Sequence, residues 1–579
     1  MPTFSALLYQ SYQHKPDQVA LYMLQGGHPD QQVSYRQLLQ GAAAYARAFE
    51  QHGIQPGEVV ILILQHGVDL VYSFFGAVLH GAIPAIMPFL TEKLLPERYR
   101  ADLASLVSIT RPAAIVTYRE FEPEVQAALA PGSPVLEPGG PVRAETLEVL
   151  RVTLERLRVI VSDQVGEPLE PDFAALGGMR RSPQDIVLLQ HSSGTTGLQK
   201  GVALSHQAVF NQLESYSLAL RLQPDDVIVS WLPLYHDMGL IAGFLMPILW
   251  GIPLVIMSPF EWVRAPYKLL QAVSRHKGTL AWLPNFAYNF CTQKIRDRDL
   301  AGVDLSSWRA ISNCSEPMRY ASHQAFLQRF APYGLRPSAL ATCYAMAENV
   351  FAVTQGGVDE PVTVDEIDRD GFQIDRVARP PEAGRPTLKM LSVGRPISNV
   401  EVKIVADDGR TLAERQVGEV ALRSDCMLNE YYHRPDATEK AFREGWYLTG
   451  DYGYMADGEV YVSGRKKDLI IVGGKNIYPQ DLELLAMEVP GVHQGRVVAF
   501  GVFNEEAGTE DVVIVAEVDT EDAGEREQIA SSVRQVVTRG SAVALRNVHI
   551  VGPHWIAKTS SGKTARLANR DKYLVEVMD

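Results

Sequence analysis

The length, composition and charge of the chain exclude several classes of protein. It has 579 residues, of which 46% are hydrophobic and 21% charged, as in an ordinary folded enzyme, and this length predicts more than one domain. The net charge of −14 argues against general nucleic-acid binding. Four widely spaced cysteines without a C-x-x-C pair predict reduced thiols in a cytoplasmic protein, rather than disulfides or a zinc site. The first residues lack the basic and apolar regions of a signal peptide, so none is expected.

Helical and β-type patterns alternate over about the first 460 residues. Residues 35–52 and 69–80 predict helices, and residues 59–64 and 83–88 predict buried strands. This strand–helix rhythm favours mostly parallel sheets with helices on both faces. We therefore predict an α/β fold for the large N-terminal part of the chain.

An apolar run at residues 239–257 needs separate attention, because it holds 19 residues without a charge. That length would permit a membrane span. However, Pro247, Gly251 and Pro253 divide the run, since proline and glycine interrupt a helix. We expect a buried helix of about ten residues, a turn and a strand over residues 254–257, and no membrane span.

Two further stretches interrupt the alternating pattern. Residues 121–171 are rich in Pro, Gly and Glu, and within them residues 144–161 predict a helix. Residues 356–390 are rich in Asp, Arg and Pro and predict an irregular insert.

The pattern changes at residues 464–468, GRKKD, where charge interrupts a strand. A compact α+β domain is expected after this point, with strands at 469–472, 496–502, 512–518 and 548–551 and helices near 480–488 and 526–538. We place the large domain at residues 1–465 and the small one at residues 466–579.

The most informative segment is HSSGTTGLQKGV, residues 191–202. Its glycines let backbone N–H groups converge, its hydroxyls add donors and Lys200 adds positive charge, which favours polyphosphate binding. It is not a Walker A loop, because Gln199 precedes Lys200 and a strand-like run follows. The expected setting is strand–loop–strand, with Ser205 capping the next helix; the alternative is a solvated loop.

This loop resembles the phosphate-binding signature of the adenylate-forming superfamily, which includes acyl-CoA synthetases, peptide-synthetase adenylation domains, luciferases and fatty acyl-AMP ligases. Further segments occur in that family's order: WLPLYHDMGL (231–240), SNCSEPM (312–318), TCYAMAEN (342–349), GWYLTGD (445–451), SGRKKDLIIVGGKNIYPQD (463–481) and IAKTSSGKTAR (556–566). The resemblance spans nearly the whole chain. It implies a large N-terminal domain of βαβ-type subdomains and a small C-terminal domain that rotates about a hinge.

The resemblance also implies roles for individual residues. Those implied to bind the nucleotide are Ser192, Ser193, Gly194, Thr195, Thr196, Gly197, Lys200, Ser315, Glu316, Pro317, Tyr344, Asp451 and Arg465. Those implied to act in catalysis are His236, Glu348, Thr196 and Lys563, with Glu348 also holding Mg²⁺. The acyl pocket is implied to include His236, Ile241, Gly243 and Phe244, and Lys467 is implied to be the hinge.

Several assignments have a plainer alternative. Asp237 beside His236 reads as a helix N-cap, and the Glu316–Pro317 pair reads as a turn. Glu348 alone would suit a solvated helix start, although a metal-bridged triphosphate needs a hard oxygen ligand. Lys558 is the competing lysine for the place of Lys563.

The resemblance implies a ligase that uses ATP and Mg²⁺. A fatty or related carboxylic acid would become acyl-AMP with release of pyrophosphate, and a phosphopantetheine thiol would then displace AMP. The segments at 233–243, 283–291 and 467–481 look most like fatty acyl-AMP ligases, which implies an acyl carrier protein as acceptor.

Two departures keep other functions open. TCYAMAEN and GGKN differ from the usual fatty acyl-AMP ligase pattern, so an acyl-CoA synthetase that uses coenzyme A is the alternative. A catalytically silent binding protein is a more distant one, because a binder would not need Lys563.

Overall fold

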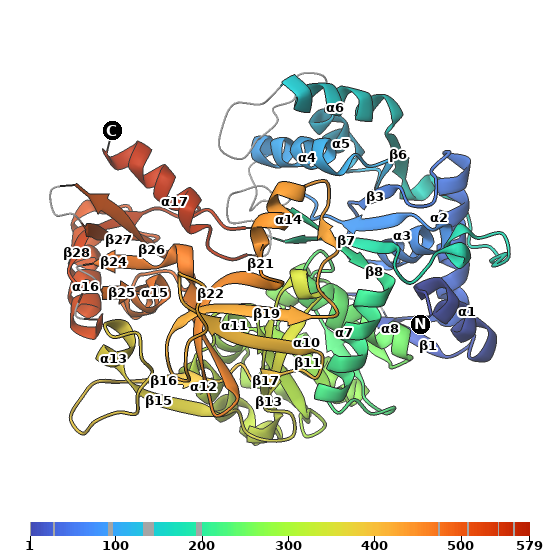
Figure 1. Cartoon of the computed structure of the whole chain (residues 1–579). Helices are drawn as coiled ribbons and strands as arrows, with labels where there is room; N and C mark the ends of the chain where they lie inside the picture. Colours follow the sequence, from blue (N-terminus) through green and yellow to red (C-terminus); the bar gives the residue numbers. More distant parts are fainter. Residues whose placement is uncertain are drawn as a thin grey trace.

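The computed structural model describes residues 2–26, 29–90, 96–130, 144–192, 200–472, 475–505, 509–541, 543–559 and 562–578. These residues form a large α/β body and a smaller α+β domain at the carboxyl end, drawn in red in Figure 1. The predicted fold class is therefore confirmed.

A nine-stranded sheet, sheet A, forms one half of the body, in the order β17-β14-β13-β12-β11-β9-β10-β1-β2. Its strands run parallel from β13 to β1, and antiparallel pairs lie at both edges. The strands are β1 (Val19–Met23), β2 (Gln31–Ser34), β9 (Ile228–Ser230), β10 (Leu254–Ile256), β11 (Leu280–Pro284), β12 (Ala310–Cys314), β13 (Leu340–Ala345), β14 (Ala352–Gly356) and β17 (Arg395–Pro396).

A seven-stranded sheet, sheet B, forms the other half, in the order β20-β8-β7-β4-β3-β5-β6. It is parallel from β7 to β6, and β7 pairs antiparallel with β8, as the strand–loop–strand prediction required. The strands are β3 (Val59–Leu62), β4 (Ile83–Ile86), β5 (Ala114–Thr117), β6 (Arg158–Val161), β7 (Ile186–Ser192), β8 (Lys200–Ser205) and β20 (Glu430–Tyr431).

Helices pack against both sheets. Ser34 and Gln37 form a reciprocal capping box at the start of α2, and Ser205 caps α7 through the Ala208 N–H. Helices α2 and α3 approach closely at Gly76, where a Cβ would lie 2.5 Å from the Tyr45 Cβ. The helices are α1 (Phe4–His14), α2 (Tyr35–Gln51), α3 (Val68–His80), α4 (Pro96–Thr110), α5 (Glu122–Ala128), α6 (Ala144–Arg156), α7 (His206–Ala219), α8 (Met246–Trp250), α9 (Pro259–Arg264), α10 (Tyr267–His276), α11 (Asn285–Lys294), α12 (Tyr320–Phe330) and α14 (Pro435–Ala441).

An antiparallel sheet, sheet C, links the body to the small domain. Its order is β18-β19-β22-β21, with β23 paired to β22. The strands are β18 (Val400–Val405), β19 (Gly418–Ser424), β21 (Phe442–Arg443), β22 (Trp446–Ala456) and β23 (Glu459–Arg465).

The small domain has its own sheet and core. The sheet order is β26-β27-β28, a β24–β25 hairpin lies beside it, and the apolar sides of α15 and α16 close its core. The elements are β24 (Ile470–Val472), β25 (Lys475–Ile477), α15 (Pro479–Met487), β26 (Val497–Asn504), β27 (Thr509–Glu517), α16 (Ala523–Ser541), β28 (Leu545–Val551) and α17 (Arg566–Tyr573).

Two sequence predictions of local structure were wrong. The helix expected at 144–161 ends at Arg156, and β6 follows it because Val159, Ile160 and Val161 pair with β5. The insert at 356–390 is not irregular: β15 (Val364–Asp368) and β16 (Thr387–Leu391) form an antiparallel hairpin with α13 (Arg369–Gln373) between them. Short polar strands with one solvated face carry little hydrophobic periodicity, so the pattern missed them.

The apolar run at 239–257 folds inside the body. It forms a π-helical segment (Met238–Leu245), α8 and β10, with Gly251 in the left-handed conformation that ends α8. Among the described residues, no helix is both long and apolar enough to cross a membrane.

Candidate active site

The predicted site residues gather at the carboxyl ends of the parallel strands of sheet A. Ser315 follows β12, Tyr344 lies near the end of β13, and His236 lies on the loop after β9. In open parallel sheets this edge is the usual position of a ligand. Residues far apart in the sequence are therefore brought to one side of the body.

Asp451 is the centre of a pre-formed polar group. Its Oδ2 accepts a hydrogen bond of 2.6 Å from the Tyr344 hydroxyl, and its Oδ1 lies 3.1 Å from Arg465 Nε. Strand pairing sets the second contact, because Asp451 on β22 is in register with Arg465 on β23. The charge of Asp451 raises the pKa of Arg465, while burial and then Asp451 raise the pKa of Tyr344. This carboxylate is 9% exposed, and its two acceptor oxygens suit the nucleotide-binding role expected of it, because they can accept hydrogen bonds from paired hydroxyls such as those of a ribose.

Glu348 is linked to Lys200 by a tyrosine that the sequence reasoning missed. The Tyr431 hydroxyl donates a 2.7 Å hydrogen bond to Glu348 Oε1, and Lys200 Nζ lies 4.5 Å from the centre of the Tyr431 ring. Tyr431 reaches this place because β20 pairs with β8. No local signal marks it, since the pairing joins residues more than 200 positions apart.

The surroundings of Glu348 fit a metal site in which a bound substrate supplies further ligands to the ion. One Glu348 oxygen receives the Tyr431 hydroxyl, and within the described part of the chain no three His, Cys, Asp or Glu residues cluster in a way that could hold a metal ion. Mg²⁺ is usually bound by one or two carboxylates together with phosphate oxygens and water. A single carboxylate is therefore sufficient for a Mg²⁺ that arrives with ATP.

The SNCSEPM segment contains backbone strain. Ser315 has a φ of 71°, and Val350, beside the Glu348 segment, has a φ of 62°. Such angles are unfavourable for residues with a Cβ and most unfavourable for a β-branched one, and they concentrate at functional sites. One of the two predicted nucleotide segments thus contains a strained residue, and the other is directly followed by one.

Glu316 is half-buried and bonded to another element, unlike a simple turn residue. Pro317 beside it is exposed. Glu316 Oε2 accepts a 2.9 Å hydrogen bond from the Phe286 N–H, at the start of α11. Desolvation raises the pKa of Glu316, and the Phe286 N–H and the charges of Lys563, Lys558 and His236 oppose this rise. Both lysines of the closing motif therefore lie near this carboxylate.

His236 forms a close pair with Asp237. His236 Nδ1 lies 2.6 Å from Asp237 Oδ1, and the two side chains are 20% and 11% exposed. Burial works to raise the pKa of Asp237, but His236 and then Lys563 outweigh it, so that the pKa is lowered. The charge of Lys563 thus acts on both Asp237 and Glu316, so this lysine of the small domain lies near the two carboxylates.

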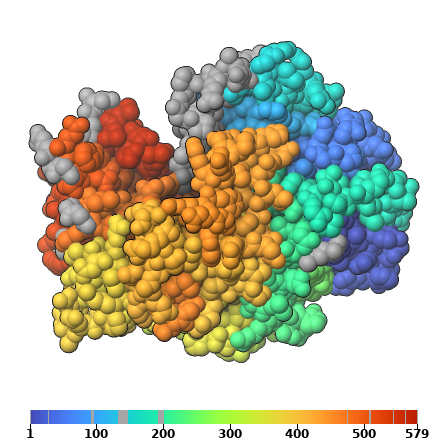
Figure 2. Space-filling model, in the orientation of Figure 1, coloured from blue at the N-terminus to red at the C-terminus, as the bar shows by residue number. Residues whose placement is uncertain are grey.

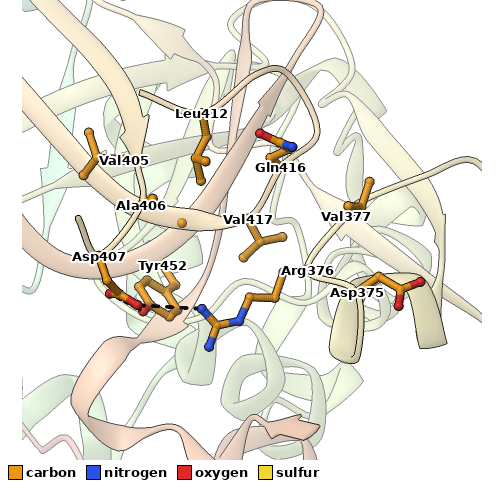
Figure 3. A pocket seen from close by; sticks show the side chains of 11 residues that line it. Asp375, Arg376, Val377, Val405, Ala406, Asp407, Leu412, Gln416, Val417 and Tyr452 are labelled. Atoms are coloured by element: carbon orange, nitrogen blue, oxygen red, sulfur yellow. Dashed lines mark hydrogen bonds and ion pairs between the residues drawn. The ribbon is translucent and has the colours of Figure 1, made fainter. Parts of the chain in front are cut away.

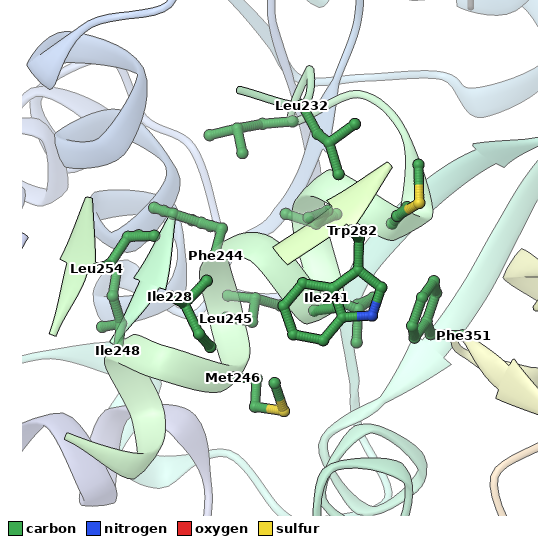
Figure 4. Close-up of a cluster of buried hydrophobic side chains, with 14 of the residues drawn as sticks. Ile228, Leu232, Ile241, Phe244, Leu245, Met246, Ile248, Leu254, Trp282 and Phe351 are labelled. Atoms are coloured by element: carbon green, nitrogen blue, oxygen red, sulfur yellow. The ribbon is translucent and has the colours of Figure 1, made fainter. Parts of the chain in front are cut away.

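Of the residues expected to form the acyl pocket, His236 lies on the loop after β9, and the other three lie in the core between the sheets. Figure 4 shows Ile241 and Phe244 in a cluster with Trp282 and Ile228, and both are fully buried. Phe244 also contacts the rings of Phe74 and Phe75. Gly243 faces Ser230, whose Oγ would lie 2.7 Å from an added Cβ, so no large side chain fits there without rearrangement.

The small domain meets the body beside the site. Arg319, which directly precedes α12, forms a 2.7 Å ion pair with Asp481 of α15. Lys467 is exposed at the junction, yet desolvation lowers the pKa of its ammonium to about 8, and Arg465 and Lys200 add to that shift. Lys467 therefore lies near Lys200 and near Arg465, the cation that pairs with Asp451.

Part of the predicted site lies outside the described residues. Ser193, Gly194, Thr195, Thr196 and Gly197 belong to this part, and only the backbone of Ser192 is described. The described strands β7 and β8 place the two ends of this segment next to each other, since Ser192 pairs with Lys200.

A separate cavity of about 220 Å³ lies between the insert and sheet C. Figure 3 shows Arg376 of the insert pointing toward Asp407 beside the Tyr452 ring. Their charged groups are 4.0 Å apart. The cavity contains charged groups and none of the proposed acyl-pocket residues, so it is no match for an apolar chain.

Comparison with known proteins agrees with this geometry. The model of the AMP-binding enzyme family matches residues 8–432. The medium-chain-fatty-acid–[acyl-carrier-protein] ligase JamA of Moorena producens is 30% identical over 604 residues, covering 100% of this chain and 96% of that protein. The 4-hydroxyphenylalkanoate adenylyltransferase of Mycobacterium tuberculosis is 29% identical, covering 90% of this chain and 82% of that protein.

The fold comparison agrees as well. A structure from a study of fatty acyl-adenylate ligases from E. coli and L. pneumophila aligns with a TM-score of 0.85 and 27% identity, over 99% of this chain and 97% of that one. The family match covers more than half of the chain, and the relatives and the fold point the same way. The chain belongs to the AMP-binding enzyme family and is an acyl-AMP-forming ligase.

Proposed function

We propose that this ligase activates a fatty acid with MgATP and transfers the acyl group to the phosphopantetheine thiol of an acyl carrier protein. The observation that carries the activation step is the convergence of Asp451, Glu348, Lys200 and the Lys563 loop on one edge of sheet A. The name of the relative JamA, a fatty-acid–[acyl-carrier-protein] ligase, supports the choice of acid and acceptor. Coenzyme A is the alternative acceptor.

In the first step the carboxylate of the acid attacks the α-phosphorus of ATP, and pyrophosphate leaves. Catalysis of such a step depends on positioning and on stabilising negative charge. Lys563 would stabilise charge at the α-phosphate, and His236 would orient the carboxylate. Lys200 would hold the phosphates, and Glu348 would hold Mg²⁺, which neutralises phosphate charge when bound.

Adenosine would be held by the body. Asp451 would accept hydrogen bonds from the ribose hydroxyls, with Arg465 and Tyr344 fixing its carboxylate through their present contacts. Tyr344 and the strained Ser315 segment would lie against the base. Ile241 and Phe244 would form part of the wall along the acyl chain.

The acceptor step requires another pose of the small domain, and we place its pivot at Lys467, next to the boundary between residues 1–465 and residues 466–579. Contacts from the insert oppose such a movement. Phe372 of α13 stacks on Tyr478 with ring centroids 5.6 Å apart, and Arg369 donates to the Gly540 carbonyl at 3.1 Å. Figure 2 shows the red small domain seated on the yellow insert. A free thiol such as coenzyme A gains no protein contacts that compensate for breaking this interface, which favours a carrier protein.

The deciding experiment measures pyrophosphate release with straight-chain acids from about four to eighteen carbons and with aryl-alkanoic acids. Thioester formation is then compared between coenzyme A and holo carrier protein. We expect acyl-AMP to accumulate with coenzyme A and to be consumed with the carrier. Rapid formation of an acyl-CoA by the intact enzyme would promote the alternative acceptor.

The insert gives a sharper form of this test. The double variant Arg369→Ala/Phe372→Ala removes contacts to the small domain and should raise acyl-CoA output, because the barrier is conformational. Lys389→Ala is the matched control, since Lys389 belongs to the same insert but lies over Tyr320 of the body, 5.2 Å from its ring centre. Lys467→Pro should spare acyl-AMP formation and suppress transfer, because proline fixes φ at the pivot.

We also infer a cytoplasmic location. All four cysteines are free and buried, which is typical of proteins in a reducing compartment. Cell fractionation with a tagged chain tests this inference.

A further inference from the structure

Asp237 has contacts that its expected role as a helix cap does not explain. An N-cap residue normally has extended backbone angles and accepts from the N–H two or three positions later. Asp237 instead has helical angles, φ −51° and ψ −47°, and accepts from the N–H of the very next residue, Met238. Its shortest contact is with His236, at 2.6 Å.

The hydrogen-bond geometry determines which ring nitrogen of His236 carries the proton. The Met238 N–H lies 2.8 Å from Asp237 Oδ1 and 3.4 Å from His236 Nδ1. An ionised carboxylate is the stronger and here the closer acceptor, so Oδ1 accepts hydrogen bonds from both the Met238 N–H and the Nδ1–H of His236. Nε2 has no hydrogen-bond partner within the described part of the chain and is the nitrogen left for a ligand.

The His236–Asp237 pair lies in the proposed reacting region and not in the core away from it. The pair lies on the loop after β9, at the ligand edge of sheet A. The charges of His236 and of Lys563, from the small domain, act on the Asp237 carboxylate. The charges of Lys563 and His236 also lower the pKa of Glu316 against the rise that desolvation causes.

We propose that Asp237 is a positioning residue for acyl-AMP formation. Its carboxylate fixes the tautomer of His236 and the orientation of the ring, so that Nε2 meets the carboxylate of the acid. Asp237 itself touches neither substrate. The proposal rests on the role proposed above for His236. It adds Asp237 as a residue that affects the substrate only by orienting the His236 ring.

A double-mutant cycle tests this proposal, because positioning through a partner is lost when the partner is absent. The variants are Asp237→Asn, His236→Ala and the two combined, assayed by ATP–pyrophosphate exchange with dodecanoate. Asparagine keeps the size of the side chain and removes its charge. We expect Asp237→Asn to lower the rate about 10- to 100-fold, as loss of a partner that orients a functional histidine does elsewhere.

Two further readouts separate positioning from loss of structure. In Asp237→Asn the KM for ATP should stay within about twofold of wild type, because Asp237 does not contact Asp451 or the two residues bonded to it, which are proposed to bind adenosine. In the His236→Ala background, Asp237→Asn should change the rate by less than about twofold. Asp226→Asn is the control for a buried carboxylate: Asp226 pairs with Arg309 at 2.5 Å at the amino end of β9, and its loss should lower Tm but leave exchange unchanged.

Equal losses from Asp237→Asn with and without His236 would overturn the proposal, as would full activity of Asp237→Asn. If His236→Ala alone has no effect, the proposed site of the acid is wrong, which is a different failure.

Discussion

Asp451 and Lys563 are expected to act on the same nucleotide, but the parts of the chain that carry them are held in different ways. Asp451 lies on β22, in register with Arg465 and bonded to Tyr344 of sheet A, so three elements fix one carboxylate. Lys563 lies on a loop of the small domain, whose contacts with the body include the Arg319–Asp481 pair and a few contacts from the insert. The groups proposed to bind adenosine are thus already in contact with one another, while the lysine proposed to act on the α-phosphate belongs to the part that we propose to move.

Removing the lysine should have the largest effect. Lys563→Ala should lower acyl-AMP formation about 10²- to 10³-fold, because one donor to charge that develops in the transition state is lost. ATP binding should remain nearly intact. Pyrophosphate release measures the first effect and titration with ATP the second. Lys558→Ala is the matched control on the same loop; a greater loss there would show that the two lysines have been assigned in the wrong order.

Removing the fixed carboxylate should affect binding rather than chemistry. Asp451→Ala should raise the KM for ATP about 10- to 100-fold, since charge-assisted hydrogen bonds contribute about 1.5–3 kcal/mol and exist before and during the reaction. Tyr344→Phe, which removes one 2.6 Å contact to the same carboxylate, should have a smaller effect. An unchanged ATP requirement in Asp451→Ala would remove this residue from the nucleotide site.

A buried histidine in the large body predicts that the stability of the fold depends on pH. His191, 8% exposed at the end of β7, has no partner for either ring nitrogen among the described residues, and burial lowers its pKa from 6.5 to about 4. The unfolded chain therefore binds the proton first, and stability falls as the pH drops through 6.5 toward 4. Between pH 7 and 5 this amounts to about 2 kcal/mol of unfolding free energy. Chemical denaturation at several pH values should show that His191→Phe loses less unfolding free energy than wild type between pH 7 and pH 5. The same loss in both proteins would contradict the lowered pKa of His191.

The smallest effect should come from the contact between the two parts. Arg319→Ala breaks an ion pair whose side chains are each 28% exposed, so a change of only about two- to fivefold is expected in acyl-AMP formation. Asp481→Ala should match it, and the double variant should be no worse. Independent, additive losses would mean that the two residues act separately and that the pair does not hold the domains together.

Much of the fold followed from the sequence, because periodic apolar patterns mark elements that face a core. Helix α2 and strands β3 and β4 appear within a few residues of the predicted bounds, as do the four strands and two helices predicted for the small domain. The pattern was wrong at β6 and at the insert hairpin, where short strands are paired with partners but carry little hydrophobic periodicity. Pairing across space, and not local composition, makes those segments into strands.

The sequence by itself determined the chemistry that the site residues can offer. A glycine- and hydroxyl-rich loop with Lys200, the His236–Asp237 pair, Glu348, Asp451 and the closing lysines are all legible as residue types in order. Only the tertiary structure decided which of them touch. It gave Asp451 two partners and joined Glu348 to Lys200 through Tyr431. It also placed Asp237, which caps the π-helical segment through the Met238 N–H, in contact with His236. The reason is physical: residue type fixes which bonds a side chain can form, but strand register and domain contact fix the distances at which these bonds exist.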